Sequence, residues 1–115
     1  MHELSIAMSL VEAAEEEASL FGNARVRALH LKLGRLSGVV KEALNSSFEL
    51  ACEGTRLEGS RLLIEELPVI IYCSQCKMSQ QLPSLQLFRC PVCDFPTGDV
   101  VQGKELQLVA LEIEE

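Results

Sequence analysis

Hydrophobic residues recur with helical spacing in two segments of the first half of the chain. Residues 4–21 have glutamates on one side and apolar residues on the other, and Gly22-Asn23 follows as a stop signal. The apolar positions of this segment are Leu4, Met8, Val11, Ala18 and Phe21. A second amphipathic segment ends at Gly54 and has its apolar positions at Leu44, Phe48, Ala51 and Cys52. The pattern therefore predicts two helices, each with one face packed on a core.

Three other segments show the pattern of β-strands: residues 25–33, 62–67 and 106–113. The second is short because Pro68 lacks the N–H that a strand ladder needs. Residues 69–72 continue in an extended run that leads into Cys73. The first strand places its side chains alternately on two faces, with Leu29, Leu31 and Leu33 on one face and Ala28, His30 and Lys32 on the other.

The order of these elements predicts an α/β (α+β) fold. A small three-stranded sheet would carry both helices on one face, with residues 1–69 and 99–115 forming this domain. Residues 70–98 would be a cysteine-containing module inserted between the second and third strands. Such a module is too short to build a core unaided. A bound zinc ion can contribute on the order of 10 kcal/mol or more to a fold of this kind, so we expect the module to collapse without metal.

Two Cys-x-x-Cys pairs lie in the inserted module, Cys73/Cys76 and Cys90/Cys93, with thirteen residues between them. Two thiolates at this spacing can hold one metal ion from a tight turn, and two such turns complete a tetrahedral site. Zinc prefers this arrangement, and four protein ligands leave no open position for chemistry. The pattern therefore predicts a structural, zinc-ribbon-like site.

A redox role for these cysteines is the alternative. A thioredoxin-like dithiol needs a pair at a helix N-terminus, where the helix dipole lowers the thiol pKa. Neither pair begins a helical pattern, and Pro91 and Pro96 favour turns instead. The fifth cysteine, Cys52, shares the apolar face of the second helix, which predicts a small buried hydrophobic residue.

Charge and composition limit the classes of partner. The net charge of −7 argues against nucleic acid or an anionic membrane as partner. No apolar run approaches the roughly 20 residues that span a bilayer, and the N-terminus does not have the pattern of a secretory signal. An odd number of cysteines without export indicates a reducing compartment, so we expect a cytoplasmic protein. No phosphate-binding loop, nucleophile elbow or catalytic triad pattern is present, and the sequence predicts no enzyme.

The sequence Met1-His2-Glu3 offers a second kind of metal site. The α-amine of Met1, the amide nitrogen of His2 and the His2 imidazole can close fused chelate rings on one ion, and Glu3 adds a carboxylate. Nitrogen donors in a plane suit Ni(II) or Cu(II). This requires that the helix begin at about Leu4. A solvated histidine in a frayed terminus is the alternative for His2, and an exposed surface imidazole is the expectation for His30.

The chain resembles the HypA/HybF family of hydrogenase nickel-insertion proteins over nearly its whole length. The motifs that carry the resemblance are Met1-His2-Glu3-Leu4, Gly34-Arg35-Leu36-Ser37, both cysteine pairs, Gly103-Lys104-Glu105-Leu106 and Glu112-Ile113-Glu114. The resemblance implies a nickel metallochaperone that binds Ni(II) at His2, with backbone donors from Met1 to Glu3. It also implies structural zinc at Cys73, Cys76, Cys90 and Cys93, and a nickel-binding domain around the inserted zinc domain.

The partners that the resemblance implies are the [NiFe]-hydrogenase large subunit precursor, a HypB-like maturation GTPase and, in some members, urease maturation proteins. Two other hypotheses remain. A zinc-ribbon protein–protein interaction module would hold zinc and take up no specific nickel. A thiol oxidoreductase would have an accessible dithiol that can be reduced without loss of structure.

Overall fold

The computed structural model describes residues 2–22 and 24–114, which form two compact units. The first unit comprises Met1–Lys32, Gly38–Glu65 and Gln107–Glu115, and the second comprises Leu33–Ser37 and Glu66–Leu106. Within the described residues, no helix has the length and the apolar character needed to cross a membrane.

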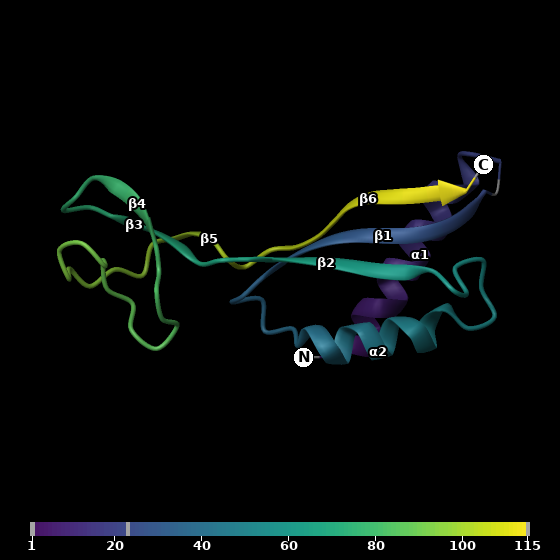
Figure 1. Cartoon of the computed structure of the whole chain (residues 1–115), viewed down its shortest axis with the longest axis horizontal. Helices are drawn as coiled ribbons and strands as arrows, with labels where there is room; N and C mark the ends of the chain where they lie inside the picture. Colours follow the sequence, from purple (N-terminus) through teal and green to yellow (C-terminus); the bar gives the residue numbers. More distant parts are fainter. Residues whose placement is uncertain (1, 23, 115) are drawn as a thin grey trace. The chain divides into compact units, whose positions relative to one another are not determined.

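The first unit contains the two predicted helices and the three-stranded sheet (Figure 1). Helix α1 spans Glu3–Ser19 and helix α2 spans Lys41–Cys52. Strands β1 (Arg25–Gly34), β2 (Arg61–Leu67) and β6 (Leu106–Glu114) form a sheet in the order β2-β1-β6. The predicted α/β (α+β) fold class is therefore confirmed, including the insertion of further strands between the second and third strands of this sheet.

Contacts at the strand ends give the directions in this sheet. The Ser60 hydroxyl, just before β2, donates a hydrogen bond to the Val26 carbonyl near the start of β1, so these two strands run parallel. Arg25 at the start of β1 lies 4.0 Å from Glu114 at the end of β6, so this pair is antiparallel. Helix α2 supplies the crossover that a parallel pair requires.

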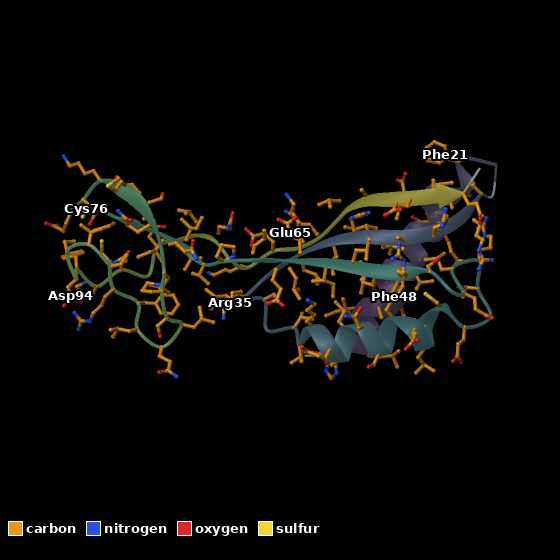
Figure 2. The ribbon with its side chains drawn as sticks, viewed as in Figure 1. Phe21, Arg35, Phe48, Glu65, Cys76 and Asp94 are labelled. Carbon is orange, nitrogen blue, oxygen red and sulfur yellow. The ribbon has the colours of Figure 1, made fainter. Side chains whose placement is uncertain are left out.

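The core of the first unit lies between the helices and one face of the sheet. Helix α2 buries Leu44, Phe48 and Cys52, as its periodicity predicts, and Phe48 lies between α2 and the sheet in Figure 2. Cys52 is only 3% exposed, which confirms that it is a buried residue.

The buried face of α1 differs from the prediction. Val11 and Ala18 are buried, but Leu4, Met8 and Phe21 are exposed by 43%, 58% and 64%. The buried positions are Ala7, Leu10, Val11, Ala14 and Ala18. The alanines among them let the helix backbone approach the core closely. The helix therefore packs on the face that carries these alanines, and the larger side chains of the predicted face remain exposed.

A second three-stranded sheet forms in the second unit, in the order β4-β3-β5. Strand β3 (Ile70–Cys73) pairs antiparallel with β4 (Met78–Gln81) and with β5 (Val100–Gln102). The extended run before Cys73 was predicted, whereas β4 and β5 were not. Strand β4 is short and largely polar, and β5 has only three residues, so their strand conformation comes from pairing with β3 and leaves little signal in the sequence.

Two glycines in the second unit permit a close approach of backbones. The Gly34 N–H donates to the Glu105 carbonyl at 2.8 Å, and the Leu36 N–H donates to the Gly103 carbonyl at 2.7 Å. A Cβ atom on Gly34 would lie 2.1 Å from the Gly103 oxygen. Gly103 itself has φ of 133°, which L-residues rarely adopt. The turn after β1 and the segment before β6 therefore depend on both glycines.

We expect Gly34→Ala to destabilise the protein by at least the 1–3 kcal/mol that is roughly typical of overpacking, because backbone atoms occupy the space that the methyl group needs. The urea midpoint of the metal-loaded protein should fall. Gly98→Ala is the matched control, since a Cβ at Gly98 meets nothing within 4 Å. Equal midpoints for the two variants would show that the close approach contributes nothing to stability.

Candidate metal centres

The first cysteine pair lies in the turn between β3 and β4. Cys73 is the last residue of β3 and pairs with Met78 of β4, so the hairpin holds this turn in place. The Lys77 N–H donates to the Cys73 carbonyl at 2.7 Å, and the Cys76 N–H donates to the Cys73 sulfur at 3.4 Å. Lys77 has φ of 57°, the left-handed conformation that lets the chain double back after the second cysteine.

The second pair has the same backbone geometry in a loop. The Asp94 N–H donates to the Cys90 carbonyl at 2.8 Å, and Asp94 has φ of 64°. The Cys90 N–H donates to the Phe95 carbonyl at 2.9 Å, and the Arg89 guanidinium contacts the Asp94 carboxylate at 3.9 Å. The chain therefore builds one turn twice, each with its two cysteine side chains directed to the same side.

The four thiols converge to the dimensions of a tetrahedral metal site. The Cys73 and Cys93 sulfurs lie 3.5 Å apart, and those of Cys76 and Cys90 lie 3.8 Å apart. All four sulfur atoms lie within 4.8 Å of one another. Zinc–sulfur bonds of about 2.3 Å in a tetrahedron place neighbouring sulfurs about 3.8 Å apart, so the group fits zinc. Among the described residues it is the only group of three or more metal-binding side chains.

The environment of the sulfurs separates their acidities. The Cys93 backbone N–H donates toward the Cys90 sulfur and lowers the pKa of that thiol to about 7. A hydrogen bond with the Cys93 side chain raises the pKa of the Cys76 thiol to about 12. A metal ion binds thiolates and must displace these protons, so metal affinity at this group falls as the pH falls.

The core around this site is small. Val69, Ile71 and Leu82 are its buried hydrophobic residues, with Leu36, Phe88 and Val100 partly buried against them. Cys73 and Cys90 are themselves buried, while Cys93 is exposed. Three buried apolar side chains contribute little free energy of folding, so a bound ion would be a major part of the stability of the second unit.

His2 lies at the start of α1, in the first unit. It is the N-cap residue of this helix, it is exposed, and its side chain makes no capping hydrogen bond. The helix begins at Glu3, one residue before the predicted start at about Leu4. Even with this earlier start, His2 precedes the first helical residue. The first N–H groups of a helix have no acceptor within the helix, so the His2 amide makes no helical hydrogen bond. Met1, which the sequence also predicts as a nickel ligand, lies outside the described residues.

Glu3 contacts the beginning of α2. Its Oε2 accepts a hydrogen bond from the Val40 N–H at 3.3 Å, and this backbone donor is the main cause of the lowered pKa of Glu3. Val40 is the N-cap residue of α2, and its own side chain makes no capping hydrogen bond. The Glu3 carboxylate, which belongs to α1, accepts the hydrogen bond of the Val40 N–H and so helps to cap α2. Sequence reasoning missed this contact because a backbone amide at a valine has no signature in the sequence.

The remaining cysteine and histidine are not part of the cysteine group. Cys52 lies in the core of the first unit, where burial raises the pKa of its thiol to about 11. The His30 Nε2 lies 2.6 Å from the Glu112 carboxylate on the neighbouring strand β6, with both side chains partly exposed. The predicted surface histidine therefore has a hydrogen-bond partner that was not foreseen.

Comparison with known proteins places the chain in a family. A family model described as "Hydrogenase/urease nickel incorporation, metallochaperone, hypA" matches residues 1–113. The chain belongs to the HypA family. The hydrogenase maturation factor HypA of Roseiflexus sp. is 54% identical over 115 residues, covering 100% of this chain and 94% of that protein. The HypA factor of Chloroflexus aurantiacus is 51% identical over 112 residues, covering 97% of this chain and 98% of that protein.

Two solved structures of HypA proteins have the same fold. A solution structure of the Ni metallochaperone HypA from Helicobacter pylori superposes with a TM-score of 0.67 at 27% identity, covering 98% of this chain and 97% of that one. A second HypA solution structure gives a TM-score of 0.73 at 26% identity, covering 99% and 97%. The predicted HypA/HybF resemblance is thus confirmed along the whole chain.

We expect Cys73→Ala to abolish stoichiometric zinc binding, because three thiolates no longer close the tetrahedral group. Metal analysis of the purified variant checks this. Amide signals from the second unit should lose their dispersion in NMR spectra while those of the first unit persist. Cys52→Ala is the control, since Cys52 lies outside the group, and this variant should keep its zinc. Unchanged zinc content in Cys73→Ala would contradict the assignment of the site.

Cys52 should react slowly with iodoacetamide in the zinc-loaded native protein. The thiolate is the reactive form, and the pKa of about 11 leaves little thiolate at pH 8, while burial restricts access. Unfolding in guanidinium with a chelator should bring the rate to that of a free cysteine. Mass spectrometry of the modified peptides measures both rates. Fast native alkylation at Cys52 would mean that the end of α2 opens readily.

Proposed function

We propose that this protein carries nickel and delivers it to the [NiFe]-hydrogenase large subunit precursor during maturation of that enzyme. Ni(II) binds at the N-terminus, through the α-amine of Met1 and the backbone and imidazole nitrogens of His2. Membership in a family described by nickel incorporation supports the proposal. The observation that carries the assignment to His2 is its position, exposed and immediately before the first turn of α1.

The start of α1 suits this chemistry. A backbone nitrogen can bind Ni(II) in a planar site only after it loses its proton, so it must not be donating to a helical carbonyl. The His2 amide meets that condition because the N-cap amide has no acceptor in its own helix. An exposed chelate of a few residues can also release its ion to a better site, which a delivery protein requires.

We propose that Cys73, Cys76, Cys90 and Cys93 hold structural zinc. Four thiolates complete the coordination shell, so this ion would exchange slowly and stay with the chain. The first unit is then a nickel-binding domain. The second unit, which contains the predicted module of residues 70–98 together with flanking residues that pack on it, is a zinc-binding domain. The two ions would thus bind at separate sites. The nickel ion must leave its site readily, whereas the zinc ion must stay bound.

The proposed partners follow from the delivery role. They are the hydrogenase large subunit precursor, a HypB-like maturation GTPase and, in some settings, urease maturation proteins. Glu3 contributes to the nickel site by one of two routes, either as a ligand or through its hydrogen bond to the Val40 N–H, which holds the start of α1 beside the start of α2.

Calorimetric titration with Ni(II) tests the nickel site. His2→Ala removes the imidazole and N-terminal acetylation removes the amine, so each should abolish specific binding. Because the His2 side chain is exposed and buries no core surface, His2→Ala should leave the melting temperature within about 1–2 °C of the native value.

His30→Ala is the matched control for loss of an imidazole, since His30 lies on β1 and pairs with Glu112. It should bind nickel as the native protein does. Native-like nickel binding by both His2→Ala and the acetylated protein would place the site elsewhere. One zinc per chain with no specific nickel uptake would instead favour a zinc-ribbon interaction module.

A further inference from the structure

Strand β2 is an edge strand with one strand partner. In the sheet order β2-β1-β6, its inner side pairs with β1, and no described strand pairs with its outer side. Residues 61–67 contain no proline or glycine, which would protect or interrupt the edge. No other described strand pairs with the outward backbone N–H and C=O groups of residues 61–65, so an added strand can pair with them there.

A groove follows this edge between β2 and α2. Two adjoining hollows of about 900 Å³ and about 360 Å³ are lined on one side by α2 and on the other by residues at the start of β2. Four residues line both hollows. They are Ser46 and Glu49 of α2 and, on the opposite wall, Ser60 and Arg61. Figure 1 shows α2 running alongside β2. A groove between an edge strand and a helix suits an extended peptide, because the strand supplies main-chain partners and the helix contacts side chains.

The charge of the groove favours a cationic occupant. Its larger hollow is lined by Glu49, Glu53 and Glu58 against one cation, Arg61. Glu49 and Glu53 are four residues apart, a spacing at which like charges repel. Both lie at the C-terminal end of α2, where the helix dipole disfavours negative charge and no basic residue is present in the last turn. Neither carboxylate has a hydrogen bond or ion pair among the described residues.

A long cationic side chain fits this distribution better than a metal ion. The carboxylates of the groove do not approach one another closely enough to form a metal-binding group, since the cysteine cluster is the only such group in the described part of the chain. A lysine or arginine needs one or two carboxylates near its head and apolar surface along its stem. Leu50, which is 57% exposed and lines the larger hollow, offers that surface.

We propose that the groove between α2 and β2 binds an extended segment of a partner protein that pairs with the outer edge of β2 and places a lysine or arginine against Glu49 and Glu53. The groove and residues 61–65 of β2 lie in the first unit, and this surface does not depend on the nickel site. It would give the protein a docking mode in which backbone pairing supplies affinity and the carboxylates select basic segments.

The test uses the zinc-loaded full chain and synthetic peptides as long as β2, seven residues. The probe alternates threonine and valine around one central lysine. ¹⁵N NMR titration should shift the amides of β2 and of the second half of α2, and alternate amides of β2 should become protected from hydrogen exchange. A peptide with glutamate in place of lysine should bind at least about tenfold more weakly.

Two controls separate the parts of the proposal. The variant Glu49→Lys/Glu53→Lys should lose at least about tenfold in affinity. The variant Glu12→Lys/Glu16→Lys makes the same change of charge at the same spacing on the exposed side of α1, and should bind as the native protein does. A lysine peptide that is N-methylated at alternate residues keeps its side chains but cannot pair as a strand, and should fail to bind.

Five outcomes would overturn the proposal. The first four are no shift at β2 with millimolar lysine peptide, equal loss of affinity in the two double variants, undiminished binding of the N-methylated peptide, and the same shifts produced by magnesium chloride alone. Shifts at β2 that depend on protein concentration without peptide would identify a second copy of this chain as the occupant, and would also overturn it.

Discussion

The convergence of four cysteine thiols is the constraint on which the second unit depends. Val69, Ile71 and Leu82 are too few to hold a chain of this length in a single conformation, and strands β4 and β5 are only 4 and 3 residues long. The two identical turns after β3 and around Cys90 bring the sulfurs together, and they hold Lys77 and Asp94 in a left-handed conformation. An ion that binds these sulfurs would stabilise both turns and, through the first of them, the β3–β4 hairpin.

The first unit follows a different principle. Its stability comes from apolar packing between two helices and one face of a sheet, and its charged groups lie at the surface. Exposed groups at the helix ends can therefore serve binding without cost to the core. The start of α1 presents His2 and Glu3, and the end of α2 presents Glu49 and Glu53. The two ends have opposite dipole potentials. The negative potential at the end of α2 favours a cation, whereas a metal ion at the positive start of α1 would be held by its nitrogen ligands against that potential.

Sequence patterns were sufficient for features with strong local signals. The cysteine pairs, both helices and the three strands of the first sheet follow from spacing and periodicity. Features that depend on distant partners were not predictable. Strand β4 is polar and exists because β3 pairs with it, and His30 meets Glu112 across a separation of 82 residues. The buried face of α1 was misassigned because its alanines, and not Leu4 and Met8, pack in the core. Which face of the helix is buried depends on the shape of the surface against which it packs, and the sequence of the helix does not show that shape.

The order of strands has a consequence for how the chain becomes complete during synthesis. Strand β6 is the last element, Leu106–Glu114, yet it pairs with β1 at the centre of the first sheet. The cysteines at 73–93 leave the ribosome before β6 does. Their turns close over short stretches of sequence, whereas the sheet must wait for a contact across most of the chain. The two cysteine turns can thus form while α1 and α2 still lack the third strand of their sheet.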